Sequence, residues 1–282
     1  MKIAYGLVEG GERRVLIYQD GKYLEIEKDG LDCVMSNPIS FIKAFDLLSQ
    51  LPKRETKVIK LLPPVIPNKI FLPAVNFKSH SSETSMKPPS SPYFFTKFSS
   101  NSIIGPEDPI LIPKGVKRVD YEGEIGIVIG KKGKYIKKEE ALDYVFGYTI
   151  VNDVSFRDYQ FPEMHPYGLN WVMGKALDTA MPIGPWIVTK DEIKEFTLRI
   201  VTRLNGKVVQ DGNTEDMIFS VEDMISYLSQ GITLEPGDII TTGTPAGVAE
   251  FSGKKYLEEG DIIEIEVEKI GVLKNFVKND LK

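Results

Sequence analysis

The sequence predicts an α+β fold in which β-structure dominates. Apolar runs of strand length recur along most of the 282 residues, and only two segments carry a clear helical pattern. No glycine-rich phosphate loop follows a predicted strand. A proline-rich segment near residue 65 predicts a small N-terminal domain, residues 1–65, and a larger domain, residues 66–282.

The N-terminal domain begins with a predicted β-meander. Its strands KIAYGLV, RRVLIYQ and KYLEIE are joined by Gly-Gly and Asp-Gly turns. The segment NPISFIKAFDLLSQ predicts a helix, because Asn37 can cap it and Pro38 suits the first helical position. The apolar residues of this segment fall on one helical face: Ile39, Ile42, Phe45 and Leu48. The prolines of LLPPVIPNK then mark the domain boundary.

The larger domain is rich in predicted strands. Its apolar runs occur at 69–75, 123–129, 144–151, 184–188, 196–204, 238–242 and 261–268. The dipeptide Asn205-Gly206 predicts a tight β-hairpin between two of the strands. Ser220 and Asp223 match a capping box, which predicts a helix that ends at Gly231.

Composition narrows the class of protein. The chain has 35 basic and 40 acidic residues, a net charge of -5, which argues against a nucleic-acid or acidic-membrane partner. Cys33 is the single cysteine, so no intrachain disulfide forms, and we expect it to fill apolar space. No segment has the apolar length of a membrane span, and the N-terminus lacks the pattern of a signal peptide. We therefore expect a soluble, cytoplasmic protein.

The stretch DYEGEIGIVIG places two carboxylates on one face of a strand. Glu122 and Glu124 share that face, and Asp153 follows the end of another apolar strand. Three carboxylates from two strands suit Mg²⁺ or Mn²⁺, and a cation would relieve their mutual repulsion. Zinc fits less well, because only His80 and His165 offer nitrogen ligands. The alternative is an acidic strand end that faces solvent, the more common state of an isolated Glu-x-Glu.

Four motifs carry a resemblance to a known family. DYEGEIGIVIG, GYTIVNDVSFRDYQ, GKALDTAMPIGP and GDIITTGTPAGV occur in the order and spacing of the fumarylacetoacetate hydrolase family, over about residues 68–280. The resemblance implies a mixed β-sandwich roll with a small N-terminal β/α domain, assembled as a homodimer. It also implies Mg²⁺ or Mn²⁺ bound by Glu122, Glu124 and Asp153. Its members include acylpyruvate hydrolases and 2-hydroxyhepta-2,4-diene-1,7-dioate isomerases.

The segment NFKSHSSET lies in a polar stretch between residues 77 and 92 that has no strand pattern. It resembles the family segment NYxxHxxE, which implies that His80 and Glu83 form a catalytic pair on a short lid helix. Residues three apart meet on one helical face, and a carboxylate can hold a histidine oriented and basic. The alternative is a polar loop with an incidental histidine.

Five further residues complete the predicted site. Arg157 and Gln160 follow the third carboxylate by four and seven residues, so a helical turn can bring them near the metal to bind a substrate carboxylate. The alternative for Arg157 is a salt bridge to Asp158 or to another neighbour. The resemblance implies that Lys175 stabilises an enolate oxygen, and that Gly243 and Thr244 offer an N–H and a hydroxyl to a carboxylate. By pattern alone, the last two residues form only a turn.

Some residues depart from the family pattern. Phe156 stands where a small alanine is usual, so we expect its ring to narrow or reposition the substrate pocket. The segment 161–171, which contains His165, is individual to this chain, and we expect it to shape specificity. We expect Trp171 and Trp186 to pack in a core.

Three hypotheses follow for function. The first is hydrolysis of an acylpyruvate-type 2,4-dioxo acid, in which Glu83 orients His80 to activate water and Lys175 stabilises a pyruvate enolate. The second uses the same site to decarboxylate a 2-oxo acid, isomerise a 2-hydroxy-dienedioate, or dehydrate or cleave a 2-keto-3-deoxy sugar acid. The third is a non-enzymatic, metal-stabilised protein that binds oxo acids. The motifs do not separate the first two, because substrate specificity depends on the pocket wall.

Overall fold

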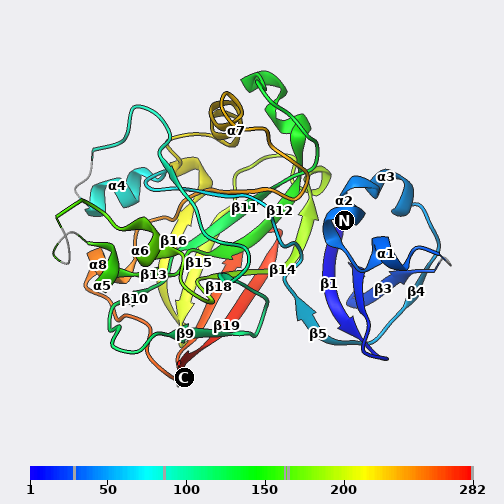
Figure 1. The fold of residues 1–282 in the computed structure, drawn as a ribbon, viewed down its shortest axis with the longest axis horizontal. Helices are drawn as coiled ribbons and strands as arrows, with labels where there is room; N and C mark the ends of the chain where they lie inside the picture. The colour runs from blue at the N-terminus through cyan, green and yellow to red at the C-terminus, as the bar shows by residue number, and fades with distance from the viewer. Residues whose placement is uncertain (28–29, 85–86, 162, 164–165, 281–282) are drawn as a thin grey trace.

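The computed structural model describes residues 1–27, 30–84, 87–161, 163 and 166–280. Figure 1 shows a β-rich body and, beside it, the N-terminal strands drawn in blue. Strands outnumber helices in both parts, so the prediction of an α+β fold with dominant β-structure is confirmed.

The N-terminal strands form the predicted meander. They pair in antiparallel order, and β1 also pairs with the last of them: β1 (Lys2–Val8), β2 (Arg13–Gln19), β3 (Lys22–Ile26), β4 (Lys53–Glu55) and β5 (Val58–Leu62). Three short helices lie between β3 and β4: α1 (Asp32–Met35), α2 (Pro38–Lys43) and α3 (Phe45–Leu48). Asn37 caps α2 as predicted by accepting a hydrogen bond from the Ser40 N–H at 3.1 Å. The single predicted helix is wrong in its length, because the backbone leaves helical geometry at Ala44.

The same sheet continues into the body of the protein. Lys2 and Ile3 of β1 pair with Val188 and Ile187. From β1 the strand order is β14 (Met181–Thr189), β12 (Val145–Asn152), β11 (Gly123–Ile129), β17 (Ile239–Thr241), β6 (Ile70–Pro73) and β7 (Phe94–Phe95), with β8 (Ile103–Ile104) pairing β14 off this path. Because β1 extends the sheet of the body, the division into domains near residue 65 stays a prediction.

A second sheet covers one face of the first. Its strand order is β16 (Lys207–Asn213), β15 (Arg199–Leu204), β18 (Ile262–Val267), β19 (Gly271–Asn279) and β9 (Pro109–Ile112). Ile125 and Ile127 of the first sheet share a buried core with Ile200 and Ile265 of the second, so the two sheets form a sandwich. All seven apolar runs predicted as strands in the body lie on strands of these sheets.

The predicted turn and helix signals are confirmed. Asn205 and Gly206 join β15 to β16 with φ values of 50° and 77°, which suit the two central positions of a type I′ hairpin turn. The Ser220–Asp223 capping box is formed in both directions, at 3.2 and 3.1 Å, at the start of α7 (Val221–Ser229). The apolar face of α7 then packs into the core between the sheets.

The remaining elements are short. They are α4 (Lys78–Thr84), β10 (Val119–Asp120), η1 (Lys138–Tyr144), β13 (Ser155–Phe156), α5 (Arg157–Gln160), α6 (Trp171–Lys175), η3 (Lys190–Glu192), η4 (Thr214–Asp216) and α8 (Ala249–Ser252). Trp186 packs against the core as expected and stacks on Tyr18 with ring centroids 4.5 Å apart. Cys33 is exposed, so the expectation that it fills apolar space is wrong. Within the described residues, no helix combines the length and apolar character needed to span a bilayer.

Candidate active site and metal centre

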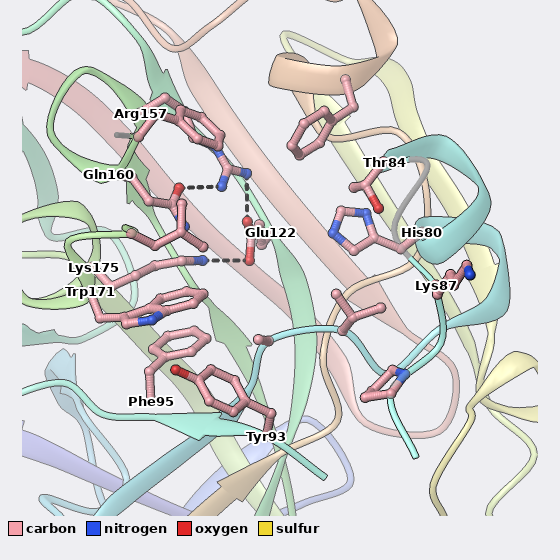
Figure 2. Close-up of a pocket in the computed structure, with 16 residues that line it drawn as sticks. His80, Thr84, Lys87, Tyr93, Phe95, Glu122, Arg157, Gln160, Trp171 and Lys175 are labelled. Atoms are coloured by element: carbon pink, nitrogen blue, oxygen red, sulfur yellow. Dashed lines mark hydrogen bonds and ion pairs between the residues drawn. The ribbon is translucent and has the colours of Figure 1, made fainter. Parts of the chain in front are cut away.

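A cavity of about 250 Å³ lies where α4, α5, α6 and α8 meet the end of β11. Figure 2 shows its labelled side chains, with His80 on one side of Glu122 and Lys175 on the other. Most of its wall is apolar or aromatic: Ala74, Val75, Pro89, Tyr93, Phe95, Phe161, Leu169, Trp171 and Phe251. Arg157, Gln160 and Lys175 gather at Glu122, whereas Thr84 and Lys87 lie on the His80 side of the cavity.

The three predicted carboxylates converge beside this cavity. Glu122 immediately precedes β11, Glu124 lies within it, and Asp153 immediately follows β12. The antiparallel register brings the strand ends together, and the Asp153 N–H donates to the Glu122 carbonyl at 2.9 Å. One carboxylate oxygen from each residue lies within 4.8 Å of the others, and all three residues are buried. The prediction that these acids form one cluster is confirmed.

Glu122 is the best compensated of the three acids. Its Oε1 accepts from Arg157 Nη2 at 2.6 Å and from Ser155 Oγ at 3.1 Å, and its Oε2 accepts from Lys175 Nζ at 2.7 Å. Burial would raise the pKa of Glu122, but the positive charges of Lys175 and Arg157 outweigh burial and lower it. Glu122 is therefore held as a carboxylate.

Glu124 forms no ion pair among the described residues, although the positive charge of Lys175 acts on it from a distance. Its Oε2 accepts a hydrogen bond of 3.2 Å from the Gly243 N–H. A hydrogen bond from the Thr241 side chain lowers the pKa of Glu124, but burial outweighs it. Burial raises the pKa of Glu124 well above its ordinary value, and the negative charges of Asp153 and Glu122 raise it further. Without a further positive charge beside it, Glu124 therefore favours the protonated form, and a bound cation would favour its carboxylate.

Lys97 is a site residue that the sequence analysis missed. Its ammonium is completely buried, 2.8 Å from Asp153 Oδ1, and donates to the carbonyls of Val154, Lys175 and Ala180. Burial lowers the pKa of Lys97 to about 8. The only signal in the sequence is a lysine within the aromatic segment YFFTKF, which does not distinguish a buried lysine from an exposed one.

The charges of the cluster test whether a divalent cation fits. Four buried carboxylates face three buried cations, which leaves one net negative charge when all are ionised: Asp120, Glu122, Glu124 and Asp153 against Lys97, Arg157 and Lys175. A divalent cation would make the cluster positive by one charge and would suit an anionic ligand. The donor set of three carboxylates also matches the preference of Mg²⁺ and Mn²⁺ for oxygen. Glu122, Glu124 and Asp153 therefore fit such an ion.

The predicted short helix is present as α4, and it brings His80 and Glu83 together; its action as a lid stays a prediction. His80 Nδ1 lies 3.3 Å from Glu83 Oε2, while Glu83 Oε1 accepts from the Gly247 N–H at 2.9 Å. The start of the helix is held by Asp216, whose carboxylate accepts from the Ser79 N–H at 2.8 Å. His80 is buried and lines the cavity, so the pair is oriented and faces the space next to Glu122.

Comparison with known proteins identifies the family to which this chain belongs. The family model described as fumarylacetoacetate (FAA) hydrolase, C-terminal, matches residues 69–278, well over half of the chain. The chain belongs to the fumarylacetoacetate hydrolase family. Its relatives include oxaloacetate tautomerases of mitochondria, 44% identical in Rattus norvegicus and 43% in Homo sapiens over 234 residues, which are 82% of this chain and 73% of each relative.

Solved structures of the family show the same fold. A 5-carboxymethyl-2-hydroxymuconate delta-isomerase from Mycobacterium smegmatis has a TM-score of 0.80 at 30% identity and covers all of both chains. A maleylpyruvate hydrolase from Sphingobium has a TM-score of 0.77 at 28% identity, over 99% of this chain and all of the other. The expected family fold, a mixed β-sandwich, is confirmed, and the relatives include both isomerases and hydrolases.

The Arg157 guanidinium donates most of its hydrogen bonds to side chains of the same chain. Its Nε and Nη2 donate to Asp120 Oδ2 at 3.0 and 2.9 Å, and its Nη1 donates to Gln160 Oε1 at 2.7 Å. With the bond to Glu122, four of its five N–H groups have protein acceptors. The salt-bridge alternative is therefore present, but with Asp120 and Glu122 as the partners, while Asp158 pairs with Arg118. Arg157 and Gln160 both line the cavity, and their binding of substrate stays a prediction.

Gly243 and Thr244 lie behind the cavity wall. The Gly243 N–H donates to Glu124, while Thr244 Oγ1 donates to the Gly123 carbonyl at 3.0 Å and accepts from Gln210 at 2.8 Å. Neither residue lines the cavity. Both groups that were expected to bind a substrate carboxylate are therefore engaged within the protein, and a role in substrate binding stays a prediction.

The departures from the family pattern have different outcomes. Phe156 is fully buried in a second core with Val119 and Tyr121 and does not line the cavity, so the expectation that it narrows the pocket is wrong. Trp171 stacks on Phe95 at 4.7 Å and lines the cavity, so packing in a core is only part of its role. Other residues of segment 161–171 also border the cavity: Phe161 and Leu169. His165 lies outside the described residues.

Proposed function

We propose that this protein catalyses the metal-dependent keto–enol interconversion of a 2-oxo dicarboxylic acid, with oxaloacetate as the test substrate. The observation that carries this proposal is the position of His80 and Lys175 on opposite sides of Glu122 in one cavity. The names of the rat and human relatives, which are oxaloacetate tautomerases, support the choice of substrate.

Tautomerisation moves one proton from C3 to the 2-oxo oxygen and breaks no bond between heavy atoms. Mg²⁺ or Mn²⁺, held by the three carboxylates, supplies Lewis-acid polarisation of the 2-oxo group when bound. His80, oriented by Glu83, is placed to take the C3 proton and to return it to the oxygen of the enol.

Lys175 is suited to stabilise the negative oxygen that forms between these two proton transfers. Two of its three N–H groups are held by Glu122 and Asp153 at 2.7 Å each, and the side chain lines the cavity. Burial opposes the ammonium charge, but the negative charges of Asp153 and Glu122 raise the pKa of Lys175 above its ordinary value. A charged donor in a buried site is an effective stabiliser of an oxyanion.

The second candidate is hydrolysis of a C–C bond in an acylpyruvate-type acid, and the His80–Glu83 pair favours it. Tautomerisation needs only one proton carrier, whereas hydrolysis also needs a base that activates water. Glu83 is anchored on both oxygens, by His80 and by the Gly247 N–H, as expected for a residue that holds such a base. The hydrolase among the solved relatives supports this candidate.

A substrate panel tests the two candidates. Chelator-stripped protein would be reloaded with Mn²⁺ and incubated with oxaloacetate or an acylpyruvate, and enol absorbance, pyruvate and CO₂ would be measured. Faster enol decay with oxaloacetate supports the tautomerase, whereas pyruvate release from the acylpyruvate supports the hydrolase. Binding of both acids without turnover would support the oxo-acid binding protein instead.

A variant of His80 tests its assigned role. His80→Ala should abolish turnover and leave Mn²⁺ uptake, measured by titration calorimetry, unchanged. Ser82→Ala is the matched control, because Ser82 lies on the exposed side of the same helix and bonds only to the Lys78 carbonyl in the contacts described. Undiminished turnover in His80→Ala would remove the proposed base.

The homodimer and the cytoplasmic location are also proposals. Light scattering tests the first against the mass of 31.7 kDa expected for one chain. The named relatives of rat and human are mitochondrial, so cell fractionation is needed for the second.

A further inference from the structure

The buried carboxylate of Asp120 binds two parts of the cavity wall from behind, the Arg157 side chain and the start of α8. Asp120 is fully buried at the end of β10, and its carboxylate accepts five hydrogen bonds. Oδ1 accepts from the N–H groups of Tyr121 and Ala249 at 2.8 and 2.7 Å. Oδ2 accepts from Arg157 Nε and Nη2 at 3.0 and 2.9 Å and from the Glu250 N–H at 3.1 Å.

Asp120 supports the start of α8. The residue that precedes α8, Val248, provides no side-chain cap, and Asp120 instead accepts the N–H groups of its first two residues. The helix carries Phe251, whose ring lines the cavity. That ring lies edge-on to the His80 ring, with the two ring centroids 6.1 Å apart. The Arg157 guanidinium carbon lies 5.8 Å from the centroid of the Phe251 ring. Asp120 thus fixes the position of an aromatic ring that contacts two predicted site residues.

Asp120 also orients the Arg157 guanidinium. Asp120 holds the edge formed by Nε and Nη2, and this directs Nη1 toward Gln160 and the cavity. Arg157 Nη2 is also shared with Glu122 at 2.6 Å. Without Asp120, Glu122 would be the remaining carboxylate partner of Arg157 and would draw the planar fork out of its present orientation.

We propose that Asp120 is a positioning residue that sets the Arg157 fork and the Phe251 ring relative to each other, and thereby the part of the wall that receives a substrate carboxylate. This inference rests on the proposed function only in that the ligand is a 2-oxo acid bound beside the metal. Asp120 itself does not line the cavity, so it acts through the two residues that do.

The first test is oxalate binding by titration calorimetry to Mn²⁺-loaded Asp120→Asn, a readout that does not require turnover. The amide keeps the size of the side chain and an acceptor for Ala249, but its NH₂ group cannot accept from Arg157. We expect oxalate to bind about tenfold more weakly, because hydrogen bonds to a charged group are displaced. Loss of a negative charge by itself would strengthen the binding of an anion, so equal or tighter binding would overturn the proposal.

A double variant keeps the test informative if Asp120→Asn does not fold. Removal of both partners of a buried ion pair is tolerated better than removal of one. Added to Arg157→Ala, Asp120→Asn should weaken oxalate binding by clearly less than about tenfold, because only its support of α8 and the Phe251 ring remains to be lost. A further loss of about tenfold or more would show that Asp120 does not act through Arg157 and would overturn the proposal.

Asp158→Asn is the matched control. Asp158 accepts from the N–H groups of Lys117 and Arg118 at 2.9 and 2.6 Å, and no described contact joins its side chain to the Arg157 side chain or to α8. Its oxalate affinity should stay near that of the unaltered protein, and an equal loss would show a general effect of removing an acid from this region. If the unaltered protein binds Mn²⁺ but no oxalate, the proposed function fails together with this inference. If the unaltered protein binds oxalate and Asp120→Asn binds it equally well, this inference alone fails.

Discussion

Replacement of Lys97 by methionine should destabilise the protein before any question of activity arises. Methionine fills a similar volume but removes a donor that serves three backbone carbonyls and an ion pair with Asp153. These groups lie in the interior, where water does not replace a lost donor.

The expected loss follows from these contacts. The Ala180 carbonyl keeps the Val154 N–H at 3.1 Å, so the carbonyls of Val154 and Lys175 are the two left without a described partner. Each buried carbonyl left without a partner costs about 1–1.5 kcal/mol, so two cost about 2.5 kcal/mol. Loss of the ion pair adds to this cost, because Asp153 keeps Lys175 but the buried cluster loses one of its three cations. With an unfolding entropy of about 2.1 cal/mol/K per residue over 282 residues, a loss of about 2.5 kcal/mol from the carbonyls alone lowers Tm by about 4 °C.

Differential scanning calorimetry of the chelator-stripped protein measures this shift without the contribution of a bound ion. Lys114→Met is the control, because Lys114 is exposed and no ion pair of the described residues involves it. A Tm shift for Lys97→Met below about 2 °C, or no larger than that of the control, would refute the claim that Lys97 secures these carbonyls.

Three smaller predictions concern the stability of local structure. Ser220→Ala removes half of the capping box of α7 and should cost about 1 kcal/mol in a denaturant titration, with Asp223→Asn expected to be milder. Gly206→Val places a β-branched residue at φ 77° in the hairpin turn and should cost roughly 1–3 kcal/mol by the same measurement. The hydrogen bond from Arg199 lowers the pKa of Asp211. The contribution of this bond to stability is therefore present above the unfolded-state pKa of Asp211 and is lost as pH falls through the folded-state pKa. The difference in unfolding free energy between the unaltered protein and Arg199→Ala should shrink from about pH 6 to about pH 3.

The elements that the sequence predicts well are those specified by neighbouring residues. The hairpin at Asn205-Gly206 and the capping box of α7 each depend on residues within a few positions, and both form as expected. The helix after Pro38 was predicted too long, because its apolar period continues across Ala44 although the backbone does not. The strand order was not predicted, since it depends on pairings such as Gly126 with Thr241, more than a hundred residues apart.

The site shows the same division. Glu122, Glu124 and Asp153 are recognisable because strand periodicity and the family motifs place them together. Lys97 and Asp120 are not, since their roles depend on distant partners: Lys97 reaches a carbonyl 57 residues away, and Asp120 reaches an N–H 129 residues away. Nothing local marks either residue as buried.

The wall of the cavity, more than the metal cluster, is expected to decide between the two candidate reactions. Both reactions pass through a negative oxygen beside the carboxylates, so the cluster serves either of them. An acyl tail would pack against the aromatic side chains Phe161, Trp171 and Phe251, which suits the hydrolase. A second carboxylate needs a cation, and Lys87 is the one lysine or arginine of the described cavity wall that is not already bound to the cluster. Lys87→Met should therefore raise KM for oxaloacetate and leave KM for an acylpyruvate with an apolar tail unchanged; an equal effect on both would show that the wall does not discriminate in this way.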